Sequence, residues 1–215
     1  MYKNNIKGIE AINNLMCTVK RYDIINYLIN KNKFSNYLEI GVYQGDNIRK
    51  IQAINKDGVD PGVEGYLTSE VNYPVTSDEF FKIIKDSKIK YDVIFIDGLH
   101  HADQVNKDIE NSLKHLLPGG YIVVHDCIPI NYEAQKVPRE TLLWNGDVWR
   151  SIVKLRLSRS DLQIRVVDTD FGIGIINFGY MNNYRLKNTI DWEYFNQNKK
   201  TILNIISVEE FEDIY

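Results

Sequence analysis

The feature that most constrains the fold of this chain is a short apolar run at residues 91–96, YDVIFI, which stops at an Asp-Gly pair. Such a run, bounded by turn signals, is typical of a strand buried on both faces of a sheet. From Asp103 onward, apolar residues recur at helical spacing until a Pro-Gly-Gly stop at residues 118–120, and the next apolar run, YIVV, follows at residues 121–124. A strand, a helix and another strand in this order predict a parallel sheet that helices cover on both faces.

The rest of the chain continues this alternation and ends in two strand-like runs that we predict to form a closing hairpin. Helices are expected at residues 6–19, from Asp23, at 47–54, from 76 and at 147–157, and further strands at 37–40, 58–60, 71–75, 162–167 and 174–178.

The composition is that of an ordinary globular domain, with 44 % hydrophobic and 26 % charged residues in 215. A net charge of −3 gives no electrostatic footprint for nucleic acid or an anionic membrane, so we expect neither as a partner. Cys17 and Cys127 have no metal-binding spacing and suit a reducing compartment. We see no signal peptide, and no apolar run near the ~20 residues of a membrane span. A cytoplasmic location is therefore expected.

A glycine-containing turn follows the run at residues 37–40 and is the first candidate binding site. Glycine at a strand-to-helix turn lets a ligand approach the backbone closely. Asp60 lies 19 residues after Gly41, close to the spacing at which dinucleotide-binding folds place an acidic residue for ribose hydroxyls. The spacing is not G-x-G-x-x-G, however, and Tyr43 is bulky where a pyrophosphate would lie. The turn favours a nucleoside ligand without phosphates, although a plain tight turn is the alternative.

Seven segments, in their order along the chain, resemble the motifs of class I S-adenosylmethionine-dependent methyltransferases. Together they resemble the small bacterial enzymes of sugar and polysaccharide pathways (macrocin O-methyltransferase-like, methyltransferase family 24). The likeness spans residues 34–178. The segments are residues 37–45, 58–61, 76–81, 95–100, 117–126, 145–150 and 170–174.

The resemblance implies a Rossmann-like three-layer α/β sandwich, with a mostly parallel seven-stranded sheet and a C-terminal antiparallel hairpin. It implies one methyltransferase domain over residues 1–215. Its expected parts are N-terminal helices (1–33), a cofactor-binding core (34–130), a substrate or lid segment (131–161), and closing strands with a C-terminal helix (162–215).

The resemblance also assigns cofactor contacts to individual residues. For Ser77 and Asp78 the alternative to a cofactor contact is a role in a helix start, because residues 76–79 also form a capping box. The resemblance implies that the pocket for the methionine end of S-adenosylmethionine is shaped by Glu39, Gly41 and Gly45. It implies that Asp60 accepts hydrogen bonds from the ribose and that Asp97 touches the cofactor. It places Ser77 and Asp78 near the adenine.

The carboxylates Asp97 and Asp126 each follow a predicted strand at its carboxyl end, where open α/β sheets bind ligands. Two like charges close together favour a shared proton or a bound cation, and Mg²⁺ accepts carboxylates, waters and substrate oxygens as ligands. Related metal-dependent O-methyltransferases often carry Asn or Asp after the second carboxylate, where this chain has Cys127. We therefore keep two interpretations open: Asp97 and Asp126 bind Mg²⁺, or Asp97 contacts the cofactor and Asp126 caps a turn.

Histidines flank the same two strand ends, and a histidine there could remove the proton of an acceptor hydroxyl. His100 and His125 are the candidates for this general base, and Asp97 joins the catalytic set. The alternative is that His125 is a packed strand residue. Downstream, Trp144 and Trp149 could form a wall against a sugar ring or anchor the core, the latter being favoured for Trp149; Arg139 and Arg150 could meet a substrate phosphate or be ordinary surface charges.

These observations predict methyl transfer from S-adenosylmethionine to a hydroxyl of a small polar acceptor, such as a nucleotide-linked or phosphorylated sugar of bacterial surface polysaccharide synthesis, with Mg²⁺ as a candidate second cofactor. The alternatives are a non-catalytic nucleotide-binding module and an NAD-dependent oxidoreductase. In the C-terminal tail, Ile202, Leu203, Ile205 and Ile206 are expected to pack on the domain or on a second subunit, which would form a homodimer.

Overall fold

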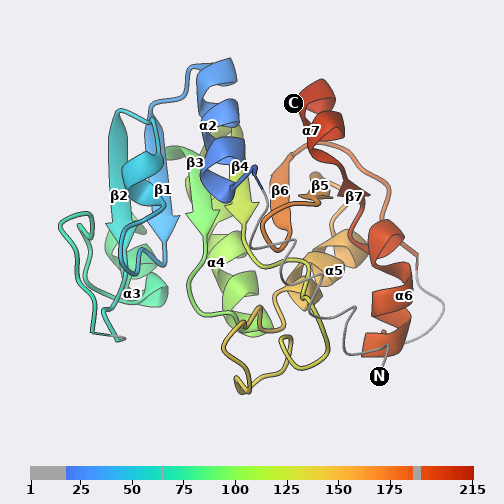
Figure 1. Ribbon diagram of the computed structural model, residues 1–215. Helices are drawn as coiled ribbons and strands as arrows, with labels where there is room; N and C mark the ends of the chain where they lie inside the picture. Colours follow the sequence, from blue (N-terminus) through green and yellow to red (C-terminus); the bar gives the residue numbers. More distant parts are fainter. Residues whose placement is uncertain (1–17, 64, 186–189) are drawn as a thin grey trace. The chain divides into compact units, whose positions relative to one another are not determined.

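The computed structural model describes residues 18–63, 65–185 and 190–215 (Figure 1). The chain divides into two compact units. The N-terminal unit comprises residues 21–99 and 103–124. The C-terminal unit comprises residues 100–102 and 125–215, with the described residues before 21.

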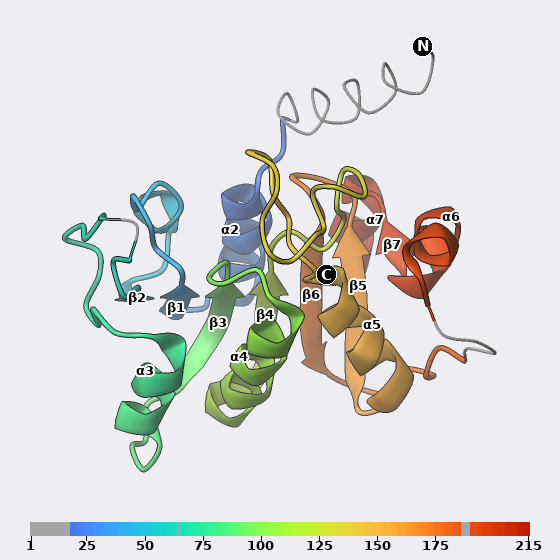
Figure 2. The ribbon, with the colours of Figure 1, turned by 90° about the horizontal axis from the view of Figure 1, so that it is seen from below.

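The N-terminal unit contains four parallel strands in the order β2-β1-β3-β4. Figure 2 shows α2 on one face of these strands and α3 and α4 on the other. The elements are α2 (Arg21–Asn32), β1 (Asn36–Ile40), the 3-10 helix η1 (Ile48–Lys50), β2 (Asn55–Val59), α3 (Ser77–Ile84), β3 (Tyr91–Ile96), α4 (Ala102–His115) and β4 (Leu116–Val124).

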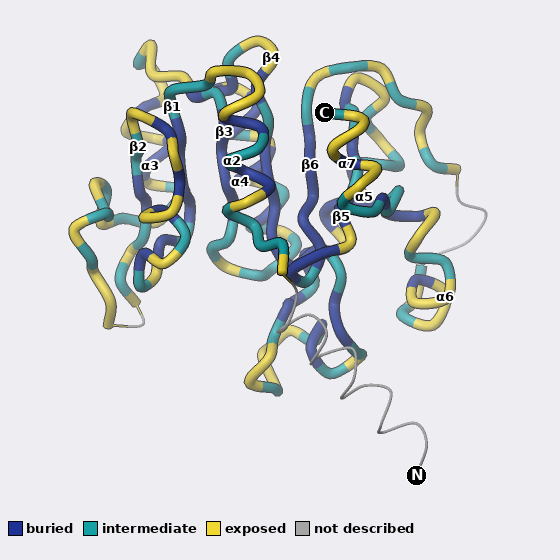
Figure 3. Tube along the Cα trace, turned by 45° about the horizontal axis from the view of Figure 1, so that its top comes forward, coloured by how far each residue is buried: buried dark blue, intermediate teal, exposed yellow. Residues whose placement is uncertain are grey.

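The carboxyl ends of the central strands are in register, which fixes where the candidate site lies in this unit. Ile40 of β1 pairs with Ile96 of β3, and Ile96 pairs with Val124 of β4. The apolar runs are buried on both faces, as Figure 3 shows in dark blue for β1 and β3. Polar residues that follow these strands therefore emerge at one edge of the sheet.

The C-terminal unit is built on the expected antiparallel hairpin. Strands β5 and β6 pair over their full length, and β7 adds in parallel to β5. Trp149 stacks on Phe195 with ring centroids 3.9 Å apart, so Trp149 is a core anchor, as its helical position favoured. The elements are α5 (Trp149–Ser158), β5 (Leu162–Val167), β6 (Ile173–Phe178), α6 (Trp192–Ile202), β7 (Ile205–Ile206) and α7 (Val208–Ile214).

The C-terminal tail packs within its own unit. Ile202 and Leu203 are fully buried, and Ile206 is nearly so. Of the two expectations for these apolar residues, packing on the chain's own domain is confirmed.

Several expected elements have different bounds. The helix predicted at residues 47–54 is only η1, because the chain enters β2 at Asn55. The strand predicted at 71–75 is reduced to a single bridge between Tyr73 and Val59. β4 starts at Leu116, before the Pro-Gly-Gly stop, because residues 118–120 lie in a register shift opposite Asp92. The predicted helix at 6–19 falls almost entirely outside the described residues.

Among the described residues, no helix combines the length and apolar character needed to cross a membrane.

Candidate active site

The turn after β1 lies directly against the chain that leaves β3. Gly41 has a left-handed φ of +89°, and a Cβ at this position would stand 2.2 Å from the carbonyl oxygen of Asp97. The Asp97 amide donates a hydrogen bond to the Ile40 carbonyl at 2.8 Å. Only glycine meets both requirements, which explains the residue type at the first position of the glycine motif.

Asp60 holds this turn from the end of β2. Its Oδ2 accepts a hydrogen bond from the Tyr43 amide at 2.8 Å, and its Oδ1 accepts one from the Gly62 amide at 2.7 Å. The turn closes with the Gly45 amide donating to the Val42 carbonyl at 2.8 Å. Asp60 is half-buried beside the glycine turn, the position from which a carboxylate could bind a ribose.

Glu39 is a buried acid at the end of β1. Its Oε2 accepts hydrogen bonds from the Tyr37 hydroxyl at 2.5 Å and from the Asn47 amide at 2.8 Å. Burial is the main cause that raises the pKa of Glu39 from its ordinary value of 4.5 to about 7, against the lowering effect of these two hydrogen bonds. Asp97 raises this pKa further and Arg21 lowers it, so both charges act on Glu39.

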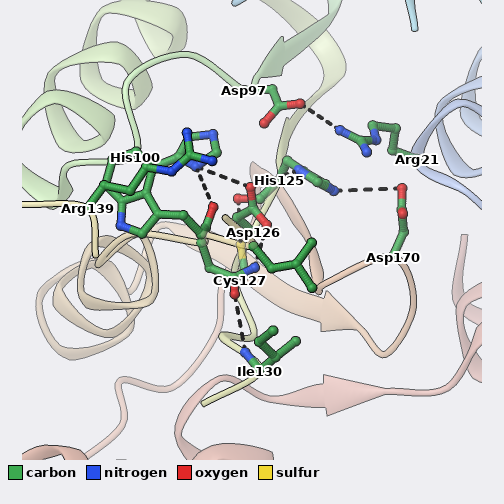
Figure 4. A network of polar contacts seen from close by, with 12 residues as sticks. Arg21, Asp97, His100, His125, Asp126, Cys127, Ile130, Arg139 and Asp170 are labelled. Atoms are coloured by element: carbon green, nitrogen blue, oxygen red, sulfur yellow. Dashed lines mark hydrogen bonds and ion pairs between the residues drawn. The ribbon is translucent and has the colours of Figure 1, made fainter. Parts of the chain in front are cut away.

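Asp97 pairs with a cation that the sequence motifs do not include. The Arg21 guanidinium, at the start of α2, donates from Nη1 to Asp97 Oδ2 at 2.7 Å (Figure 4). The two side chains are 28 % and 16 % exposed, so this ion pair is partly shielded from water and stronger than a surface pair.

Ser77 and Asp78 lie in the first turn of α3, and their helix begins with the expected capping box between Thr76 and Glu79. Gln104 of α4 reaches across to them: its Nε2 lies 3.1 Å from Ser77 Oγ and 3.0 Å from Asp78 Oδ1. The capping interpretation is confirmed. It does not exclude a contact with adenine, since the cap uses neither the Ser77 nor the Asp78 side chain.

A second polar cluster lies in the C-terminal unit around Asp126. This residue adopts a left-handed φ of 60° immediately after His125, a conformation that aspartate tolerates better than most residues. Asn145 Nδ2 donates to Asp126 Oδ1 at 2.6 Å. The Nδ1 atoms of His125 and His100 lie 3.1 Å and 3.4 Å from Asp126 Oδ2 (Figure 4).

The two histidines of this cluster differ in exposure. The His125 side chain is 3 % exposed, and its Nε2 lies 3.7 Å from Asp170 Oδ2. Asp170 in turn lies 3.6 Å from the Lys20 ammonium. The His100 side chain is 20 % exposed. Of the two candidate bases, His100 is therefore the more accessible within its unit, and His125 lies between two carboxylates.

The segment before α5 positions His100. The ring of His100 stacks on Trp144 with centroids 5.3 Å apart and an angle of 22°. The His100 carbonyl accepts a hydrogen bond from the Asp147 amide at 3.2 Å, and a Cβ at Gly146 would stand 1.9 Å from that carbonyl. The Arg139 guanidinium lies over the ring of Trp144, with its Cζ 5.7 Å from the ring centroid.

Sequence reasoning missed the partners of the candidate residues. Arg21, Asn47 and Gln104 carried no motif signal, because each reaches the site only through packing. Asn145 and Asp170 stood inside recognised motifs but were given no role. Cys127 is buried, and its Sγ lies 3.8 Å from the His125 carbonyl.

Comparison with known proteins gives one family-model match within the chain. Residues 38–127 match the family model of methyltransferase family 24, described as a methyltransferase domain. Over these residues the chain is similar to a methyltransferase domain. The match agrees with the family and with the enzyme class, S-adenosylmethionine-dependent methyltransferases, that the order of the motifs leads us to expect. No curated protein matches the sequence.

Solved structures confirm the Rossmann-like methyltransferase fold. One is described as a candidate caffeoyl-CoA O-methyltransferase from Staphylococcus aureus, with a TM-score of 0.54 at 18 % identity, covering 82 % of this chain and 91 % of that one. Another is the S-adenosylhomocysteine-bound methyltransferase PaMTH1 of Podospora anserina, with a TM-score of 0.54 at 14 % identity, covering 74 % and 78 %. The mostly parallel strands and the C-terminal antiparallel hairpin agree with this fold.

The close approach at Gly41 predicts a large cost for any side chain there. Gly119 provides a matched control, because it has a φ of +81° but open space around its Cβ position. In urea unfolding of the protein, Gly119→Ala should cost about 1 kcal/mol for the left-handed backbone alone, and Gly41→Ala roughly 3 kcal/mol or more. Equal costs for the two variants would contradict the contact with Asp97.

The raised pKa of Glu39 predicts a pH-dependent stability. Between pH 4.5 and about 7 the folded chain keeps a proton that the unfolded chain loses. The free energy of unfolding should therefore fall as pH rises through this window, by up to about 3 kcal/mol, and stay level above it. Glu39→Gln should remove this component, so the wild-type and variant curves from urea unfolding should diverge across the window. Parallel curves would show that Glu39 titrates normally.

Proposed function

We propose that this protein is a methyltransferase that moves the methyl group of S-adenosylmethionine to a hydroxyl of a small polar acceptor. The observation that supports the donor is the gathering of Glu39, Gly41 and Asp97 at the adjoining ends of β1 and β3, in a chain whose residues 38–127 match a methyltransferase domain. The reaction is an in-line displacement at the sulfonium methyl, for which catalysis comes mainly from positioning and deprotonation.

In this proposal the N-terminal unit binds the donor. Glu39, Gly41 and Gly45 shape the pocket for the methionine end, and Asp60 binds the ribose hydroxyls. Ser77 and Asp78 lie at the adenine, with Asp78 as a hydrogen-bond acceptor whose pKa is lowered chiefly by the hydrogen bond from Gln104. An ionised Asp78 is suited to accept from the exocyclic amine of adenine.

We assign deprotonation of the acceptor hydroxyl to His100. Its imidazole is the more exposed of the two candidates, and Trp144 holds the ring in place by stacking. Asp126 lies beside its Nδ1 and stabilises the imidazolium that forms when the proton is taken up. His125, buried between Asp126 and Asp170, supports this carboxylate rather than meeting the acceptor.

The acceptor in this proposal is a nucleotide-linked or phosphorylated sugar of surface polysaccharide synthesis. The support is chemical: Trp144 offers an aromatic face suited to a sugar or base, and Arg139 beside it offers a guanidinium suited to a phosphate. Both belong to the segment 131–161 that the sequence marked for the substrate.

The proposal includes Mg²⁺, with Asp97 and Asp126 as its candidate ligands. Carboxylate oxygens are suitable Mg²⁺ ligands. The fit is partial, because Arg21 already pairs with Asp97 and a thiol follows Asp126. A bound ion would lower the pKa of the acceptor hydroxyl; the roles given above to the chain's own residues do not depend on it.

Donor binding is testable by calorimetric titration with S-adenosylhomocysteine. We expect saturable binding by the wild type, weakened roughly 100-fold in Asp60→Ala because the charge-assisted hydrogen bonds to the ribose are lost together with those that hold the glycine turn. Asp46→Ala is the matched control, since this exposed carboxylate stands beside the same turn. Absence of binding by folded wild-type protein would remove the donor proposal and favour a different ligand, which a parallel titration with NAD would test.

The same titration tests the metal. Added Mg²⁺ should raise the affinity for S-adenosylhomocysteine in the wild type but not in Asp126→Asn. An identical affinity with and without Mg²⁺ would remove the ion and leave the rest of the proposal standing.

The base is testable by transfer of a labelled methyl group to a panel of nucleotide-linked and phosphorylated sugars. His100→Ala should lower the transfer rate by roughly 10²- to 10⁴-fold while leaving the affinity for S-adenosylhomocysteine within about two-fold, because the residue does not contact the donor. His101→Ala, its neighbour in sequence, is the control and should keep the wild-type rate. A wild-type rate in His100→Ala would exclude His100 as the base.

A further inference from the structure

We propose that Arg21 binds the carboxylate of the donor's amino-acid group, so that α2 supplies a determinant of cofactor recognition outside the sequence motifs. This inference rests on the proposed function, because it deepens the account of how the donor is held.

The geometry brings a cation to the place where the motifs supply only acids. Arg21 opens α2, which packs on the unit through a buried face of Ile24, Ile25, Leu28 and Ile29. Its guanidinium reaches Asp97 at 2.7 Å, although the two residues are 76 positions apart in the sequence. Asp97 itself stands against the glycine turn through its contact with Gly41. The cation is therefore fixed beside the pocket assigned to the methionine end.

The charges of this cluster complement an amino-acid zwitterion. Glu39 and Asp97 are acids, and Asp97 raises the pKa of Glu39 while Arg21 lowers it. An ammonium group is attracted to such a pair of acids, and a carboxylate is attracted to the guanidinium. The amino-acid end of S-adenosylmethionine carries both groups on one carbon, so one ligand satisfies both parts of the cluster.

Arginine is suited to hold two carboxylates at once. Its planar group carries five N–H donors and stays protonated at all working pH values. It can therefore bond Asp97 and a ligand carboxylate in the same plane, whereas the single ammonium of a lysine acts as a point charge. Both Arg21 and Asp97 are partly exposed, so a ligand can reach them without unfolding of α2.

A set of three ligands separates this role from simple neutralisation of Asp97. S-adenosylhomocysteine carries the ammonium and the carboxylate, its decarboxylated analogue carries the ammonium alone, and 5′-methylthioadenosine carries neither. The affinity of each is measured by calorimetry for the wild type, Arg21→Gln and Arg21→Lys. Arg159→Gln is the control for loss of one positive charge, since Arg159 pairs with the exposed Asp161.

Arg21→Gln should weaken the binding of S-adenosylhomocysteine roughly 10- to 100-fold, the range expected for a lost hydrogen-bonded charge. It should change the affinities for the other two ligands less than about two-fold. The affinity of Arg21→Lys for S-adenosylhomocysteine should fall between those of the wild type and Arg21→Gln. Retained binding of 5′-methylthioadenosine shows that the variant is folded with its nucleoside pocket intact.

Equal weakening of all three ligands would overturn the inference and make Arg21 a structural partner of Asp97. An unchanged affinity for S-adenosylhomocysteine would overturn it as well. Failure of the wild type to bind S-adenosylhomocysteine at all is a different result, which would refute the proposed function itself.

Discussion

The candidate donor site depends on one backbone contact, that of the glycine turn after β1 with the first residue after β3. The in-register pairing of Ile40 with Ile96 brings the two strand ends together, and the missing side chain of Gly41 lets the Asp97 carbonyl occupy the space of a Cβ. This contact sets the distance between the two carboxylates of the site, because Glu39 precedes the turn and Asp97 follows the neighbouring strand. A wider turn would separate them and leave no compact cluster for a small ligand.

Bringing acids together in a protected place is costly unless they are hydrogen-bonded or paired with cations. The chain meets this cost separately in each unit. In the N-terminal unit, Tyr37 and Asn47 donate to Glu39, and Arg21 pairs with Asp97. In the C-terminal unit, Asn145 donates to Asp126, which also lies beside two imidazoles. These partners fix the orientation of the acids before any ligand arrives, which is the preorganisation that transition-state stabilisation requires.

The sequence predicts best what depends on local pattern and on strand topology. The run at residues 91–96 forms β3 with the expected bounds because it is buried on both faces, and the hairpin of β5 and β6 follows from its turn. The prediction of a helix at residues 47–54 was wrong, because helical spacing alone does not reveal that the chain must reach β1 as a strand at Asn55. Candidate residues at strand ends could be named because parallel strands bring such ends together. Their partners on helices could not, since helix packing over long sequence separations leaves no local signal.

The sequence predicted the acids at the strand ends but not the partners that neutralise them, and this affects the argument for a metal. Two carboxylates read from sequence alone suggest a missing cation, because like charges without compensation are unfavourable. The folded chain supplies cationic or cation-forming groups of its own: Arg21 at Asp97, and His100 and His125 at Asp126. The electrostatic need that pointed to magnesium is thus met in large part by side chains that no motif contained.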